Sequence, residues 1–458
     1  MIAVDPNGTA AAGPAAYIGA FLPGVDKANG MQVLGKNGVP LNPYTTKSLV
    51  AAPRIGFAYD VFGNGRTALR GGFGVFYNRL DGNQVYNMSG HAPLVYTQSV
   101  SQGNMNDLAT GTVTGVVAPG SASFYSGLTP IPMVKNASLG LQQELGFQTA
   151  LKVAYVGNWS TQQPFRSNLN PVALGANWNP ANVSPVTGAA LTQDGSSLER
   201  SKYPGLGDLN REIFLGHSNY NALQVTLQHR LSTGVLFGAA YTWSRSLGTT
   251  SYDSLMTLGA PYQNNDARNY GLLSNSRSQT LVLHYSWALP SVGNHYLGAV
   301  LNHWTFSGLT TFNAGTPYGV GFNTHGKDYT GTRNEGVRVN QISNPSANVP
   351  AGYIFNPNAF AAPLLPAGTP QSTAQIGNLG NNPFTLPGWE DWDMSFMKFI
   401  PVGFNEGSGL SLQVQAYNVF NHPQFTSFGT TLTSPSSFGR PTGTNEGRIL
   451  AFNMRYSF

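Results

Sequence analysis

The chain has 458 residues, of which only 9% are charged, with a net charge of +5, 55 glycines and no cysteine. Soluble proteins carry about 25% charged residues, so this composition argues against a large soluble domain. The positive charge forms no basic run, so we expect no nucleic-acid partner, and the lack of cysteine excludes disulfides and thiolate metal sites. No segment approaches the about 18 consecutive apolar residues of a transmembrane helix.

The first alternating segments begin near residue 54 and are joined by a tight turn. "RIGFAYDVF" is followed by "GNG" and then by "RTALRGGFGVFY". Because side chains in a strand alternate between two faces, both segments predict strands with one apolar face. Asn64-Gly65 is a strong signal for a hairpin turn. The apolar positions are Ile55, Phe57, Tyr59, Val61, Leu69, Phe73, Val75 and Tyr77.

The same alternation recurs along the rest of the chain. It appears in "ASLGLQQEL" and "TALKVAYVG", "YNALQVTLQHR" and "VLFGAAYTWSRS", "QTLVLHYSWAL" and "WTFSGLTTFNA", "WEDWDMSFMKF" and "LSLQVQAYNVF", and the terminal "RILAFNMRYSF". These segments predict about eleven strands of roughly 9 to 12 residues, the length that a tilted strand needs to cross a bilayer. In the last strand, one face holds Leu450, Phe452, Met454, Tyr456 and Phe458.

Short and long connections alternate between these strands. The short ones are 63–65, 146–148, 231–234, 290–303 and 400–409, and the long ones are 78–136, 158–218, 247–278, 315–388 and 421–447. Long structureless loops are uncommon in compact soluble domains. Outer-membrane barrels have short periplasmic turns and long extracellular loops. The sequence therefore predicts an all-β, antiparallel transmembrane β-barrel with long extracellular loops, surrounded by the lipid of the bacterial outer membrane.

Several stretches resemble the barrel region of TonB-dependent outer-membrane receptors, specifically the Oar-like group of acidobacterial type. They are "PRIGFAYDVFGNGRTALRGGFGVFYNR", "SNYNALQVTLQHRLSTGVLFGAAYTWSRSL", "GLTTFNAGTPY", "DWDMSFMKF", "YNVFNHPQF" and "RILAFNMRYSF", from about residue 50 to the end. The resemblance implies a barrel of about 22 strands with an N-terminal plug, importing ligands too large for porins by coupling to TonB. "RYSF" is similar to the signal that the outer-membrane assembly machinery recognises, and Tyr456 and Phe458 fit it.

Strand direction leads to an expectation about domain organisation. If the last strand ends at the periplasm, the strand at 54–62 runs the same way, so the two cannot pair antiparallel. An odd number of further strands is then needed for closure. We expect 54–458 to be the C-terminal part of the barrel, about half of the 22 strands that the resemblance implies. We expect 1–53, which lacks the features of a signal peptide, to be an extracellular loop and linker at the start of a fragment.

No pattern in the sequence predicts catalysis, a cofactor or a metal. "GMQVLGKN" has Asn37 where a P-loop needs Ser or Thr, and the glycines of "GGFGVF" are interpreted as small residues facing the lumen. Glu390, Asp391 and Asp393 are interpreted as the lumen face and rim of one strand rather than as an acid–base or metal cluster. Polar residues predicted to face the lumen are Gln224, Gln228, Arg230, His284, Gln413 and Gln415. They can contact a passing ligand, or they can form a hydrogen-bonded wall against a plug.

Three functional hypotheses follow. The leading one is the barrel of a TonB-dependent receptor that imports a siderophore, oligosaccharide or peptide-like ligand and binds the TonB complex through an N-terminal plug that this sequence does not show. The alternative is an outer-membrane structural or adhesion barrel without energised transport. The third is a secreted, soluble, all-β binding protein. None of the three is an enzyme, and the ligand cannot be predicted, because variable loops determine it.

Overall fold

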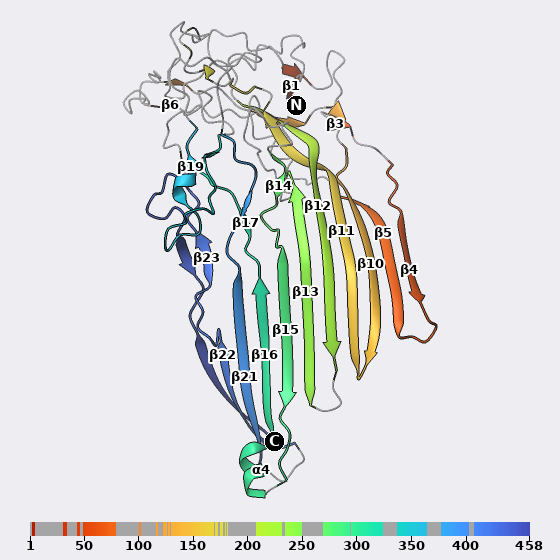
Figure 1. Ribbon diagram of the computed structural model, residues 1–458. Coiled ribbons are helices and arrows are strands. Elements are labelled where there is room, and N and C mark those ends of the chain that lie inside the picture. Colours follow the sequence, from red (N-terminus) through yellow and green to blue (C-terminus); the bar gives the residue numbers. More distant parts are fainter. Residues whose placement is uncertain are drawn as a thin grey trace, which may run out of the picture.

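The structure is a computed structural model in which eleven strands form one sheet, each hydrogen-bonded to its neighbours in chain order (Figure 1). It describes residues 49–78, 130–168, 208–230, 234–249, 269–293, 295–323, 337–363, 377–402 and 407–458, with short pieces of the remaining segments. The sheet strands are β4 (Arg54–Asp60), β5 (Thr67–Tyr77), β10 (Met133–Gly146), β11 (Thr149–Asn168), β12 (Leu209–His229), β13 (Val235–Gly248), β15 (Gln279–Ala288), β16 (Trp304–Asn313), β21 (Trp389–Pro401), β22 (Gly409–Tyr417) and β25 (Ile449–Ser457).

Neighbouring strands along this eleven-stranded path are antiparallel throughout. Two shorter strands, Ala122–Tyr125 and Gly271–Leu272, join the same sheet beside this path, the first of them in parallel. The predicted all-β antiparallel fold and the number of strands are therefore confirmed. The other elements are β1 (Ile2–Val4), β2 (Met31–Val33), β3 (Tyr44–Thr45), β6 (Val100–Ser101), β7 (Val116–Val117), β8 (Ala122–Tyr125), β9 (Gly127–Leu128), β14 (Gly271–Leu272), α4 (His295–Leu301), β17 (Pro317–Tyr318), β18 (Asn340–Gln341), η4 (Pro357–Ala359), β19 (Phe360–Ala361), β20 (Phe384–Thr385), β23 (Phe425–Phe428) and β24 (Pro441–Thr444). Among the residues described, no helix is long and apolar enough to cross a membrane.

Short turns and long links lie at opposite ends of the sheet (Figure 1). In the first short turn, the Gly65 amide donates to the Asp60 carboxylate at 2.7 Å and the Arg66 amide donates to the Asn64 side chain at 3.0 Å. Gly63 and Gly65 take positive φ angles of 67° and 74°, which glycine adopts without steric cost. The predicted Asn64-Gly65 turn is therefore present.

Register gives the sheet two chemically different faces. Residues paired across antiparallel strands point to the same side, and one such row crosses six strands through Val235, Trp287, Phe306, Phe396, Val414 and Phe452. We call this side the apolar face. A row on the other side, the polar face, runs through Gln142, Lys152, Thr226, Ala240, Val282, Thr311 and Asp391. Large side chains of the apolar face are solvent-exposed, including Trp243, Phe452 and Met454.

The predicted link 158–218 is wrong at both of its ends. β11 continues to Asn168 and β12 begins at Leu209, so these strands have 20 and 21 residues, more than the predicted length. The extension is held by strand pairing such as Arg166 with Glu212, and by the Asn168 amide, which donates to Asp208 at 2.8 Å. The apolar alternation is interrupted there, because β11 is mainly polar beyond Ser160 and β12 has three consecutive apolar residues, Ile213, Phe214 and Leu215.

The long links are not structureless where the structure describes them. Parts of 315–388 and 421–447 pack around one hydrophobic cluster, which we call the loop core: Val320, Val339, Phe355, Ala359, Phe360, Leu379 and Phe438. The Phe355 ring lies 5.4 Å from the Phe360 ring and 5.0 Å from the Phe438 ring, measured between centroids. Two links that are separate in sequence therefore fold as one unit at the long-loop end of the sheet, near β19 and β23 (Figure 1).

Candidate functional site on the polar face

Five of the six residues predicted to face the lumen lie on the polar face. Gln228 and His284 are both paired with Gly238, and a Cβ at Gly238 would come within 2.0 Å of the imidazole. The His284 ring therefore occupies the space that a side chain at position 238 would fill. Gln413 donates to the Ser395 hydroxyl at 2.9 Å, and Gln415 accepts from Asn453 at 3.2 Å. The remaining members of the set are Gln224, which is paired with Thr242, and Arg230, which follows the last residue of β12.

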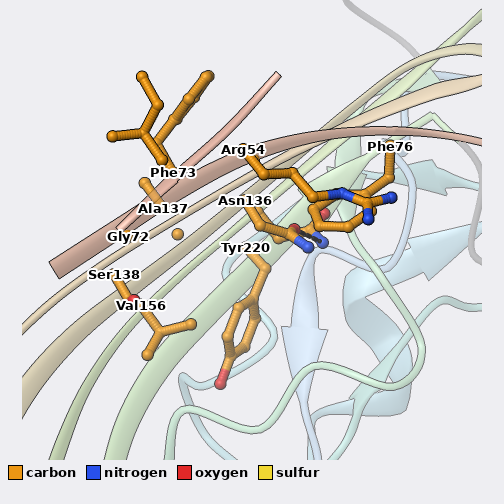
Figure 2. A pocket seen from close by; sticks show the side chains of 13 residues that line it. Arg54, Gly72, Phe73, Phe76, Asn136, Ala137, Ser138, Val156 and Tyr220 are labelled. Carbon is orange, nitrogen blue, oxygen red and sulfur yellow. Dashed lines mark hydrogen bonds between the residues drawn. The ribbon is translucent and has the colours of Figure 1, made fainter. Parts of the chain in front are cut away.

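A hollow of about 570 Å³ lies on this face where β4, β5, β10, β11 and β12 meet (Figure 2). Its lining is Arg54, Ile55, Gly72, Phe73, Gly74, Phe76, Asn136, Ala137, Ser138, Val156, Gly157, Asn158 and Tyr220. Figure 2 shows Arg54, Phe76 and Asn136 close together at one end, with the Tyr220 ring below them and Phe73 turned to the other side of the sheet. No local pattern in the sequence predicts this group of residues.

The chemistry of the hollow is that of a hydrogen-bond donor site. The Arg54 guanidinium carbon lies 4.7 Å from the centre of the Phe76 ring, a cation–π distance. Asn158 donates to Asn136 at 2.7 Å, which fixes both amides. A guanidinium, two amides and a phenol suit a ligand that presents carboxylate, phosphate or carbonyl oxygens.

Some of the glycines in this region leave space in the hollow, and others do not. A Cβ at Gly72 would have only ordinary contacts, with the Ile55 carbonyl at 3.7 Å and the Ser138 hydroxyl at 3.8 Å, whereas Gly74 is covered by the Phe76 ring at 2.7 Å. Gly71 lies on the apolar face beneath the Phe57 ring, at 2.4 Å from its would-be Cβ. The interpretation of "GGFGVF" as lumen glycines therefore holds for Gly72 and Gly74 and is wrong for Gly71.

The three acidic residues of β21 fasten a neighbouring turn. Glu390 pairs with His422 at 2.9 Å, Asp391 accepts from Gln424 at 2.9 Å, and Asp393 accepts from the Asn418 backbone amide at 3.0 Å. Asp391 and Asp393 share the polar face and Glu390 lies on the other, as strand alternation requires. Within the part of the chain that the structure describes, no group of three or more His, Asp and Glu residues could hold a metal ion. The rim interpretation fits this geometry.

The two residues that fit the assembly signal lie at the end of β25, at the short-turn end of the sheet (Figure 1). Tyr456 and Phe458 stack with ring centroids 6.2 Å apart, and Phe458 is 99% exposed. Both rings are accessible, and their recognition by the assembly machinery stays a prediction. Of Gly30 to Asn37, only β2 is described, so the remainder of the P-loop-like stretch lies outside the described residues, as does most of 1–53.

A sheet of transmembrane length with one exposed apolar face and one polar face is the wall of a transmembrane β-barrel. The family described as "Outer membrane beta barrel domain" matches residues 7–451. The chain belongs to this family, and it is a protein of the bacterial outer membrane.

Solved structures with a similar fold are outer-membrane receptors and transporters. The outer membrane transporter YddB from Escherichia coli is 10% identical, with a TM-score of 0.45 over 88% of this chain and 40% of that one. A mutant of the ferric enterobactin receptor PfeA from Pseudomonas aeruginosa is 13% identical, with a TM-score of 0.44 over 89% and 40%. FpvA from P. aeruginosa is 12% identical, with a TM-score of 0.42 over 89% and 33%. The chain thus spans 40% or less of these chains. No curated protein matches.

Proposed function

We propose that this chain is part of a TonB-dependent outer-membrane receptor of the Oar-like type, which imports a ligand too large for porins. The observation that carries the proposal is the height of the polar wall. β11 and β12 have 20 and 21 residues, whereas about 9 to 11 residues suffice for a strand to cross a bilayer. Half of each strand is thus available to build a vestibule beyond the membrane, on the side of the long loops, where a large ligand can enter.

The hollow around Arg54 supports a role in ligand passage. It combines the guanidinium of Arg54 with the amides of Asn136 and Asn158 and the phenol of Tyr220. Siderophores, oligosaccharides and peptide-like ligands all present oxygen acceptors to such donors. In this proposal the chain performs no catalysis, and its work is to bind and pass the ligand.

In this proposal, an N-terminal plug and the TonB complex couple import to an energy source. The test is import of labelled ferric siderophores, oligosaccharides and oligopeptides by cells that express the full-length protein or lack its gene. We expect import of at least one class to need both the gene and the proton-motive force. Import that is independent of the proton-motive force, or absent for every class, would contradict the proposal.

An adhesion or structural barrel is the second candidate, and the loop core favours it. Seven buried side chains give the long-loop end its own folded unit, which is a surface that another cell or molecule can bind. Under this hypothesis, loss of the gene lowers attachment of cells to surfaces and leaves import unchanged. The two measurements, made on the same strains, separate the candidates.

A further inference from the structure

Helix α4 lies in the turn between β15 and β16, below the sheet at the short-turn end (Figure 1). The turn was predicted as a plain connection at 290–303, and the helix within it was missed. Its sequence, "HYLGAVL", carries no acidic residue in the first turn and no basic residue in the last. Short turns of outer-membrane barrels face the periplasm, so α4 lies at the periplasmic side of the membrane.

A lysine holds the end of α4 against the apolar face. Lys398 of β21 is paired with Trp304 of β16, in the same alternation as Phe396 and Phe306, so its side chain leaves the sheet on the lipid-facing side. It is nevertheless only 8% exposed. Its ammonium donates to the carbonyl oxygens of Ala299 and Val300 at 3.0 Å and to that of Asn302.

Trp304 completes this attachment. Its indole N–H donates to the Val300 carbonyl at 2.8 Å, and the Lys398 ammonium lies 5.5 Å from the centre of its ring. The carbonyls at a helix C-terminus lack partners within the helix and favour a cation. Lys398 supplies that cation from the lipid-facing side. The last turn of α4 is therefore fixed outside the barrel wall, and not under the lumen.

The exposed face of α4 is apolar. Tyr296, Leu297, Val300 and Leu301 are exposed, the first of them by 85%. At 3.6 residues per turn, these four positions lie on one side of the helix. Gly298 is buried and faces the turn itself, where a Cβ would meet Asn302 at 2.8 Å and the Val292 carbonyl at 3.1 Å.

We propose that α4 is a lipid anchor, whose apolar face lies in the headgroup and acyl boundary of the periplasmic leaflet. One observation favours lipid over a protein partner. Lys398 and Trp304, which hold the end of the helix, both lie on the lipid-facing side of the wall. A helix that lies in the membrane interface binds lipid through its apolar face.

This chain contains no cysteine, and any cysteine elsewhere in the full-length protein is replaced by serine before single cysteines are introduced and labelled. Leu297→Cys and Val300→Cys place a nitroxide spin label on the apolar face, and Gly293→Cys places one in the same turn, at a position with no atom within 4 Å of the new Cβ. The full-length protein is studied in outer-membrane vesicles. The measurement is the accessibility of each label to oxygen, which concentrates in lipid, and to a water-soluble nickel chelate.

We expect labels at 297 and 300 to be mobile and several-fold more accessible to oxygen, relative to the nickel chelate, than the label at 293. Equal, water-like accessibility at all three positions would overturn the proposal. Immobile labels at 297 and 300, shielded from both reagents, would also overturn it, because a second copy or another protein would then cover the helix. The two sites are independent, so one variant that fails to assemble leaves the other to decide.

Discussion

Phe452 and Asn453 are neighbours in β25, yet they point to opposite faces of the sheet. Phe452 belongs to the apolar row through Val414 and is 75% exposed, whereas Asn453 donates to Gln415 on the polar face. An arginine on the lipid face of a barrel costs about 2–4 kcal/mol at the bilayer midplane. We expect Phe452→Arg to lower the free energy of unfolding of the full-length protein by about that amount.

Asn453→Arg is the matched control, since the same charge then faces water. The measurement is urea unfolding in lipid vesicles, followed by tryptophan fluorescence. We expect Asn453→Arg to lose little beyond its hydrogen bond to Gln415, about 1 kcal/mol. Equal losses for the two variants would contradict the assignment of Phe452 to the lipid side, and a larger loss for Asn453→Arg would show that the faces are assigned the wrong way round.

Removal of Phe458 tests assembly into the outer membrane separately from the stability of the assembled protein. Its ring is almost fully exposed and stacks on Tyr456, so its removal takes away little buried area. We expect a chain that ends at Ser457 to reach the outer membrane at a much lower level, while the free energy of unfolding of the assembled fraction changes little. Ser457→Ala serves as the control, and normal outer-membrane levels of the truncated chain would contradict the assembly signal.

The alternation of apolar and polar residues predicts on which face of the sheet a side chain lies. It does not predict the hydrogen-bond partners of that side chain. Lys398 lies among apolar positions in "FMKFI", and its parity places it on the lipid side. The carbonyls that hold its ammonium come from residues 96 to 99 positions earlier. The hollow has the same character, because Arg54, Asn136 and Tyr220 come from three different strands. Contacts of this kind depend on register between distant segments, which no local pattern in the sequence specifies.

At the scale of the element, we expect Lys398 to stabilise α4 through its contacts with the Ala299, Val300 and Asn302 carbonyls. Lys398→Met keeps a stem of similar length and removes the donors to the three carbonyls. We expect faster amide hydrogen exchange across 295–302 and a loss of roughly 1–3 kcal/mol, the cost of leaving such groups unsatisfied. Lys152→Met, on the polar face of β11, makes the same chemical change away from α4. Unchanged exchange in Lys398→Met would mean that the rest of the turn suffices to hold the helix.

The stability of the loop core should depend on pH in the alkaline range, because the phenol of Tyr318 loses its proton there. Its ring packs 5.9 Å from Phe355 and 5.5 Å from Phe384, and burial raises the pKa of its phenol from 10.0 to about 12. The unfolded loop releases this proton more readily than the folded loop, so the stability of the loop core should fall as the pH rises from about 10 to about 12.

Tyr318→Phe removes this titration and should flatten that pH dependence. The measurement is the rate of cleavage within 337–363 by an alkali-stable protease, at several pH values, in intact outer membranes. Tyr353→Phe, a second tyrosine in the same region of the long links, is the matched control. A pH dependence that is the same in Tyr318→Phe and in the unmodified protein would exclude Tyr318 as its source.

The strands could be predicted from the sequence where contact with lipid requires apolar side chains at alternate positions. The eleven sheet strands were found because the large apolar residues of each recur mainly at alternate positions. In the outer parts of β11 and β12, "STQQPFRSN" and "LNREIFLGHS", apolar residues no longer recur at alternate positions, so the pattern disappears although the strands continue. The loop core was missed for a different reason. Its members, from Val320 to Phe438, are single apolar residues scattered through segments rich in Gly, Asn and Pro.

At the scale of the whole molecule, the sheet has two open edges. Among the strands described, β4 pairs only with β5, and β25 pairs only with β22. Every pairing in the eleven-stranded path is antiparallel, so the first and last strands run in the same direction, both toward the short-turn end. An edge that is left open in lipid has a row of unsatisfied N–H and C=O groups, each costing several kcal/mol.

We expect these eleven strands to close into an antiparallel barrel only when further strands, odd in number, lie between β25 and β4. Two copies of the sheet do not satisfy this rule, because each seam would place β25 of one copy beside β4 of the other in parallel. The test is to refold this 458-residue chain alone in detergent, beside a known even-stranded barrel as control. The expected result is no heat-dependent change in gel migration and rapid digestion by protease. A heat-modifiable, protease-resistant monomer would show that β25 and β4 pair in parallel, and would refute the need for further strands.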